Sequence, residues 1–73
     1  MDELEDFILY KRVRELRIEK EWSQHHLAEL LGMSQSNISL WESGKGYPDV
    51  INLKRLAEIF EVSADYLLGL SEY

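Results

Sequence analysis

The side chains best suited to paired hydrogen bonding lie near the middle of this 73-residue chain, in the run Ser34-Gln35-Ser36-Asn37. A glutamine or asparagine amide carries a donor and an acceptor in one plane, so it matches any planar group with the reverse pattern. The N6 and N7 edge of adenine is such a group, whereas a serine hydroxyl takes either role and specifies less. The run is therefore a candidate for reading the hydrogen-bonding edge of a base.

A second chemistry-bearing pair, His25 and His26, does not predict a metal site. Adjacent helical residues point about 100° apart, whereas two histidines that chelate zinc from one helix are spaced i, i+4. The chain contains no cysteine and no third ligand is evident in the pattern. We expect no metal and no cofactor, and we interpret both histidines as exposed polar residues.

No arrangement of reactive groups predicts catalysis. The sequence shows no nucleophile in a recognisable turn motif, no glycine-rich phosphate loop and no carboxylate pair placed to perturb its pKa values. The 14 acidic and 8 basic residues are typical of a solvated surface. We therefore expect a protein that is not an enzyme.

The net charge of −6 weighs against a polyanionic partner, because nucleic-acid-binding domains usually carry a basic surface. The acidic residues are concentrated in residues 1–10 and 49–73. Residues 22–48 contain only three charged side chains, which are Glu29, Glu42 and Lys45. The middle of the chain could therefore approach phosphate groups without strong repulsion while the acidic ends face away.

Length and composition predict one domain spanning residues 1–73. The acidic N-terminus does not resemble a secretory signal, and no apolar run approaches the roughly 18 residues that a membrane span needs. The absence of cysteine fits a reducing compartment. We expect a cytoplasmic domain with no membrane contact.

Apolar spacing and end signals predict an all-α fold of five short helices. Hydrophobic residues recur at intervals of three and four, and Ser, Asp and Gly stand where helix caps are needed. The expected helices run from Asp2 or Glu3 to Lys20, from the N-cap Ser23 to Gly32, from the N-cap Ser34 to Gly44, from the N-cap Asp49 through Phe60, and from the N-cap Ser63 to Gly69.

The expected inward faces of these helices form one core. Their apolar members are Leu9, Val13, Leu16, Leu27, Leu30, Leu31, Ile38, Trp41, Leu53, Leu56, Ala57, Phe60, Tyr66, Leu67 and Leu70, with Val62 between the last two helices. Trp22 and Trp41 fit packing positions better than base-stacking positions, because large aromatics bury well.

The second and third helices form the unit with the clearest functional implication. Gly32 permits a positive φ in the short turn between them, and Ala28 is small where the two helices cross. Two short helices joined by a glycine-containing turn of three or four residues constitute a helix-turn-helix, which places its second helix in the DNA major groove.

The sequence resembles the lambda-repressor-like helix-turn-helix domains, also called the Cro/C1 or Xre type. The matching strings are RVRELRIEKEWSQHHLAELLGMSQSNISLWESGKGYPD and LKRLAEIFEVSADYLLG, and the resemblance covers roughly residues 9–70. It implies a five-helix bundle, a role in transcriptional regulation, double-stranded DNA as the partner, and a dimer on an inverted repeat.

The resemblance also implies roles for individual residues. The residues expected to read bases are Gln35, Ser36 and Asn37. The residues expected to contact the DNA backbone are Gln24, Ser34, Lys45 and Arg12. Arg17 and Glu42 match a pair that forms a largely buried salt bridge behind the recognition helix, so we assign them to structure.

Two glutamates depart from the family pattern. Many members have glycine where this chain has Glu21 and Glu61, so a positive φ at either position would introduce about 1 kcal/mol of strain. The histidines after Gln24 replace acidic residues, and basic residues are sparse in the loop after the third helix. The last two differences concern the strength of DNA binding rather than the fold.

The basic residues of the first helix have two interpretations. Lys11, Arg12 and Arg14 could form a phosphate-contacting patch, or they could pair with Glu15 and Glu19 on a solvated face. Both interpretations stay open for Arg12, and Arg14 is assigned to the solvated face.

The C-terminal segment carries more apolar side chains than its last helix needs, namely Ile51, Ile59, Tyr66, Leu70 and Tyr73. An exposed apolar cluster favours a homodimer through the C-terminal helix, although scattered surface hydrophobes are common. The leading hypothesis is a dimeric repressor. The alternatives are an antitoxin that also binds a partner protein, and a protein-interaction module that has lost DNA binding.

Overall fold

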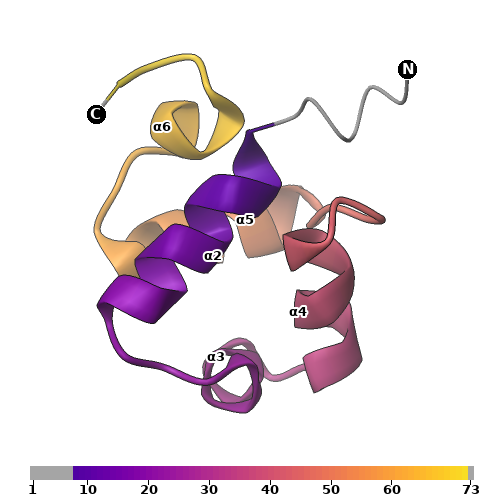
Figure 1. Cartoon of the computed structure of the whole chain (residues 1–73). Coiled ribbons are helices and arrows are strands. Elements are labelled where there is room, and N and C mark those ends of the chain that lie inside the picture. Colours follow the sequence, from indigo (N-terminus) through magenta and orange to yellow (C-terminus); the bar gives the residue numbers. More distant parts are fainter. Residues whose placement is uncertain (1–7, 73) are drawn as a thin grey trace.

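The computed structural model describes residues 8–72, which form five α-helices and no strand (Figure 1). The helices are α2 (Leu9–Glu19), α3 (Gln24–Leu31), α4 (Gln35–Glu42), α5 (Val50–Phe60) and α6 (Ala64–Leu68). The predicted all-α class is confirmed. The predicted start of the first helix at Asp2 or Glu3 lies outside the described residues. Within residues 8–72, no helix has the length and apolar character needed to cross a membrane.

Three of the predicted N-cap residues accept a side-chain hydrogen bond at the start of their helices. Ser23 Oγ accepts from the His26 amide at 2.9 Å, Asp49 Oδ1 from Asn52 at 2.8 Å, and Ser63 Oγ from Tyr66 at 3.0 Å. Each bond satisfies an amide that the first helical turn leaves without a backbone acceptor. Ser34 has the extended backbone of an N-cap, but its hydroxyl lies 3.0 Å from Ser36 Oγ and makes no capping bond.

The buried residues form a single cluster to which all five described helices contribute. Its members are Leu9, Val13, Leu27, Ala28, Leu31, Ile38, Trp41, Leu56, Phe60 and Leu67. Helix α4 packs against both α2 and α3, and α6 packs against α2 and α5. This arrangement places α3 and α4 at the end of the molecule opposite α6 (Figure 1).

The prediction that Leu30 belongs to the core is wrong, because 41% of the residue is exposed. The buried residues of α3 are Leu27, Ala28 and Leu31. At 3.6 residues per turn, Leu30 points about 100° away from the mean direction of these three side chains. Leu70 was also expected inside and is 75% exposed, because α6 ends at Leu68 and the chain turns away at Gly69.

Glu21 and Glu61 both adopt the left-handed backbone conformation, with φ values of 61° and 56°. Glycines occupy the equivalent helix ends at Gly32 and Gly69, where φ is 69° and 80°. A side chain in this region crowds the following carbonyl, so the two glutamates introduce the strain expected from their departure from the family pattern.

The mutation Glu61→Gly should therefore raise the free energy of unfolding by about 1 kcal/mol, measured by urea denaturation. The matched control is Glu15→Gly, which puts glycine in the exposed middle of α2 and should lower the free energy of unfolding by about 1 kcal/mol. Destabilisation by both substitutions would show that Glu61 is not strained.

Candidate nucleic-acid interface

The turn between α3 and α4 is short and internally bonded. Only Gly32, Met33 and Ser34 separate the two helices. The Met33 amide donates to the Ala28 carbonyl at 3.0 Å, and the Gly32 amide donates to Glu29 at 3.1 Å. With Ala28 and Ile38 buried on the two helices, these bonds hold α4 at one orientation on α3.

The start of α4 presents a row of polar side chains to solvent. Ser34, Gln35, Ser36 and Asn37 are all exposed, whereas Ile38 and Trp41 of the same helix are buried. The four residues predicted at this surface are therefore together and accessible. Their amide and hydroxyl groups can form directed hydrogen bonds with a partner that approaches α4 from outside.

A chain of hydrogen bonds connects this surface to the interior. Gln35 Nε2 lies 3.4 Å from Gln24 Oε1, and Gln24 Nε2 donates to Glu42 Oε1 at 3.2 Å. Gln24, the first residue of α3, thus links Gln35 at the start of α4 to Glu42 at its end. Gln24 Oε1 accepts from the Gln35 nitrogen and so orients the Gln35 amide. Gln35 Oε1 can still accept a hydrogen bond from a partner.

The inner end of this chain is the expected ion pair between Arg17 and Glu42. Arg17 Nε donates to Glu42 Oε2 at 2.7 Å and Arg17 Nη2 to Glu42 Oε1 at 2.9 Å, which makes the pair bidentate. Arg17 Nη1 also donates to the Trp22 carbonyl at 2.7 Å. The hydrogen bond to Glu42 raises the pKa of Arg17; partial burial opposes this rise and charge attraction to Glu42 adds to it.

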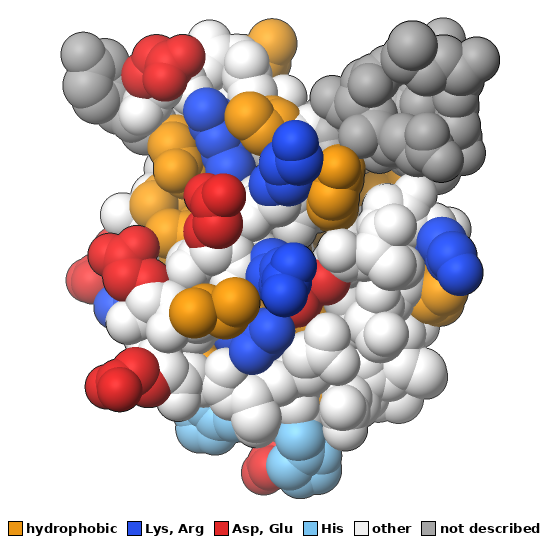
Figure 2. Space-filling view, in the orientation of Figure 1, with side chains coloured by type: hydrophobic (Ala, Val, Ile, Leu, Met, Phe, Trp, Pro, Cys, Tyr) orange, Lys and Arg blue, Asp and Glu red, His pale blue; other side chains and the backbone are white. Residues whose placement is uncertain are grey.

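Two shallow depressions lie side by side on this face. The first is lined by Gln24, Gln35, Ser36, Ser39 and Leu40, and the second by Arg14, Arg17, Gln24, Ser39, Glu42 and Ser43. Because Gln24 and Ser39 belong to both, the exposed guanidinium of Arg14 borders the polar surface of α4. Figure 2 shows Lys and Arg side chains of this face beside the largely uncharged surface of α3 and α4.

The structure places Arg12 away from the surface at which we predicted its contact with a phosphate backbone. Its guanidinium lies 4.1 Å from the ring centre of Tyr66 and donates to the carbonyl oxygens of Tyr66 and Ser71. Only 9% of the residue is exposed. Arg12 therefore fastens the C-terminal segment to α2 and has little surface to offer a ligand, whereas Arg14, which the sequence pattern assigned to a solvated face, borders the site.

Lys45 lies in the loop after α4 with its side chain exposed. Its backbone amide donates to the Leu40 carbonyl at 3.0 Å, and the Gly44 amide donates to Trp41 at 3.3 Å. These two amides close the end of α4, so they are not available to a phosphate. The Lys45 side chain, which was predicted to contact the DNA backbone, remains accessible.

The histidines show no metal-site geometry. His25 Nε2 lies 2.8 Å from Glu29 Oε1 on the surface, and the His26 ring packs edge-on to Trp22 at 5.3 Å between ring centres. Among the residues that the structure describes, no three His, Cys, Asp or Glu side chains are grouped as metal ligands.

Comparison with known proteins agrees with this geometry. A model of the helix-turn-helix family matches residues 13–67. The chain belongs to the helix-turn-helix family. Its matched segment contains all five described helices except the first four residues of α2 and the last residue of α6.

Several helix-turn-helix regulators are similar in sequence. The transcriptional activator BcrR of Enterococcus faecalis is 44% identical over 59 residues, which is 81% of this chain and 29% of BcrR. The transcriptional regulator AnsR of Bacillus subtilis is 41% identical over 58 residues, covering 80% of this chain and 50% of AnsR. The chain thus spans half or less of these two relatives.

Solved helix-turn-helix structures superpose over most of the chain. The P22 c2 repressor in complex with a synthetic operator has a TM-score of 0.81 at 32% identity, covering 86% of this chain and 96% of the repressor chain. The restriction-modification controller protein C.AhdI of Aeromonas hydrophila has a TM-score of 0.72 at 32% identity, covering 81% and 89%. The lambda-repressor-like resemblance is confirmed.

Proposed function

We propose that this chain is a sequence-specific DNA-binding transcriptional regulator that inserts α4 into the major groove of double-stranded DNA. The observation that carries the proposal is the exposed polar start of α4, with Gln35 held by Gln24 above the ion pair of Arg17 and Glu42. The P22 c2 repressor, which superposes on the chain, was solved with its operator. That likeness supports the same docking geometry.

The proposed contacts divide into two kinds. Gln35, Ser36 and Asn37 read base edges, for which a glutamine amide suits adenine. Gln24, Ser34, Lys45 and Arg14 contact the sugar-phosphate backbone and set the position of α4. The last of these residues replaces Arg12, whose guanidinium is occupied by Tyr66 and Ser71.

The acidic net charge is compatible with this interface. Of the two acids within residues 22–48, Glu42 is buried against Arg17, and Glu29 lies beside His25. The charge that a phosphate would meet on this face therefore comes mainly from Arg14 and Lys45, because Arg17 is paired with Glu42. Binding is expected to weaken steeply with salt, because each neutralised phosphate releases counterions.

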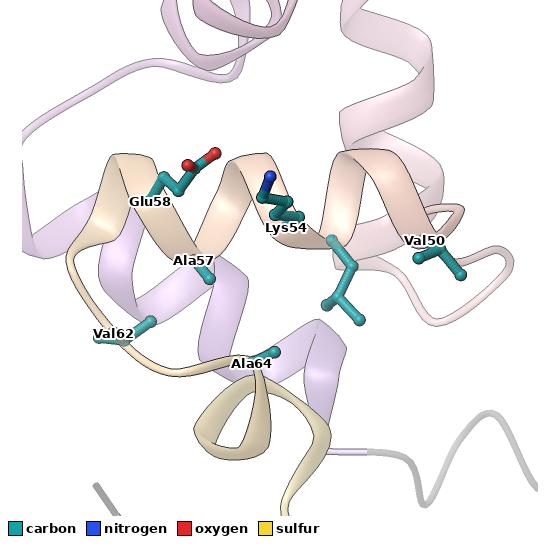
Figure 3. Close-up of a pocket in the computed structure, with 7 residues that line it drawn as sticks. Val50, Lys54, Ala57, Glu58, Val62 and Ala64 are labelled. Carbon is teal, nitrogen blue, oxygen red and sulfur yellow. The ribbon is translucent and has the colours of Figure 1, made fainter.

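We infer that the chain acts as a homodimer through α5 and the segment that leads to α6. An apolar groove there is lined by Val50, Leu53, Lys54, Ala57, Glu58, Val62 and Ala64 (Figure 3). Val50 is 82% exposed and the neighbouring Ile51 is 70% exposed. In a two-fold arrangement each copy uses the same surface, so Lys54 of one copy can face Glu58 of the other.

Repression is the simplest activity for such a dimer, because it requires only occupancy of a site. A selection of random double-stranded DNA by the purified chain at about 0.15 M salt tests the proposal. We expect an inverted repeat whose half-sites lie about 10 base pairs apart. If no sequence is enriched, the chain is a protein-interaction module, and the exposed groove is the place to seek its partner.

The mutation Gln35→Ala should weaken binding to the selected site by about 1–3 kcal/mol, or roughly five- to 150-fold, and relax the choice of one base pair. Because Gln35 is exposed, the free energy of unfolding of the DNA-free protein should stay within about 0.5 kcal/mol of the wild-type value. Binding to unrelated DNA is the internal control and should be unaltered. Equal losses on selected and unrelated DNA would place Gln35 at the backbone instead.

A further inference from the structure

Leu40 stands out on the polar face of α4. It is 45% exposed, whereas the core-facing residues Ile38 and Trp41 are 0% and 6% exposed. Leu40 lies one helical turn after Ser36 and lines the same depression as Gln24, Gln35, Ser36 and Ser39. Leu40 supplies the large apolar side chain of this depression, and the other residues that line it carry amide or hydroxyl groups.

The backbone of Leu40 is held in place by the loop that follows α4. Its carbonyl oxygen accepts from the Lys45 amide at 3.0 Å and from Ser43 Oγ at 3.1 Å. Gly46 packs alongside, since a Cβ on that glycine would lie 3.5 Å from Leu40 Cβ. The side chain is therefore presented from a fixed point rather than from a frayed helix end.

The chemistry of the major groove supplies one apolar partner for such a side chain. Thymine carries a C5-methyl group there, whereas the other base edges present hydrogen-bond donors and acceptors. Removing the methyl group and the leucine from water together is favourable, and cytosine in the same place lacks the methyl group.

We propose that Leu40 is a specificity-determining residue that contacts the C5-methyl group of a thymine. This inference rests on the proposed function, because it requires α4 to enter the major groove. Four helical residues rise about 6 Å, which corresponds to roughly two base-pair steps of 3.4 Å. The thymine should therefore lie about two base pairs from the base that meets Ser36, in each half of the inverted repeat.

Single replacement of thymine by deoxyuridine tests the contact, because it removes the methyl group and nothing else. Each thymine of the selected duplex is replaced in turn, and binding of the full chain is measured. We expect the wild-type chain to bind about fourfold more weakly when one particular thymine of each half-site is replaced. This is the effect of removing one buried methyl-sized group from the interface. Leu40→Ala should bind the thymine duplex more weakly and show no further loss on that uracil duplex.

The matched control is Leu30→Ala, which removes an equally exposed leucine from α3 outside this depression. It should keep the uracil sensitivity of wild type. Two results would overturn the role of Leu40: no uracil duplex differs from its thymine parent, or Leu40→Ala remains as sensitive as wild type. Failure of the wild-type chain to bind any duplex would instead overturn the proposed function, and the role of Leu40 with it.

Discussion

Replacing Glu42 with alanine should lower the free energy of unfolding by about 3 kcal/mol and abolish tight DNA binding. Breaking a buried ion pair by removing one partner leaves the other charge without compensation, which costs about 3–5 kcal/mol. The lower end applies here because 13% of the Arg17 side chain is exposed, compared with 4% for Glu42. Urea denaturation, followed by titration with the selected DNA, measures both effects.

The functional loss has its own cause, because Gln24 donates to the same carboxylate. Without Glu42, Gln24 loses the acceptor that orients it toward Gln35. The double mutant Arg17→Met/Glu42→Leu separates the two effects, since apolar replacement of a buried pair is often neutral for stability. It should recover much of the stability while DNA binding stays weak.

Normal DNA binding by the double mutant would show that the bracing of Gln35 is unimportant. Glu42→Gln is the conservative control, because its amide oxygen can still accept one of the hydrogen bonds from Arg17. It should fall between wild type and Glu42→Ala in stability. A loss of less than about 1 kcal/mol in Glu42→Ala would contradict the structural role of the pair.

The mutation Ile38→Ala should lower the free energy of unfolding by about 3 kcal/mol, within the 2–5 kcal/mol typical of large-to-small changes in a core. Ile38 is fully buried and belongs to the helix that carries Gln35 and Ser36. In a small domain this loss is a large part of the total stability. Chemical denaturation gives the magnitude, and circular dichroism shows whether the remaining fold is helical.

Two comparison variants make the test of Ile38 specific. Ile38→Val removes one methyl group and should cost about 1 kcal/mol. Leu40→Ala, two residues along the same helix, should change stability by less than about 0.5 kcal/mol because Leu40 is exposed. If Leu40→Ala destabilised the protein as much as Ile38→Ala, the rotation of α4 in the structure would be wrong.

Features that depend on neighbouring residues could be predicted from the sequence. Ser23, Asp49 and Ser63 cap their helices through bonds to amides three residues ahead. Gly32 and the strained Glu61 end their helices through their own φ angles. The polar start of α4 is of the same kind, since its four residues are consecutive in the chain and all four are exposed.

The use of the arginines on α2 was decided only by tertiary structure. Arg12 and Arg14 are two residues apart, but Arg12 is bound by carbonyl oxygens 54 and 59 residues further along the chain. Nothing near Arg12 in the sequence indicates that α6 will pack there. Arg14 is left exposed beside Gln24 and Ser39, so the cation at the proposed interface differs from the predicted one.

Leu30 shows the same division. It lies on a helix of eight residues, where apolar spacing alone gives more than one possible buried face. The packing of α3 against α4 buries Leu27, Ala28 and Leu31 and leaves Leu30 outside, whereas the inward residues Ile38 and Trp41 of α4 were predicted correctly. The sequence by itself determined the helices, their ends and the polar run at Gln35, because these depend on local bonds and backbone angles. Which arginine of α2 borders the proposed DNA surface was decided by how distant segments pack, because that packing buries Arg12 against the C-terminal segment and leaves Arg14 exposed.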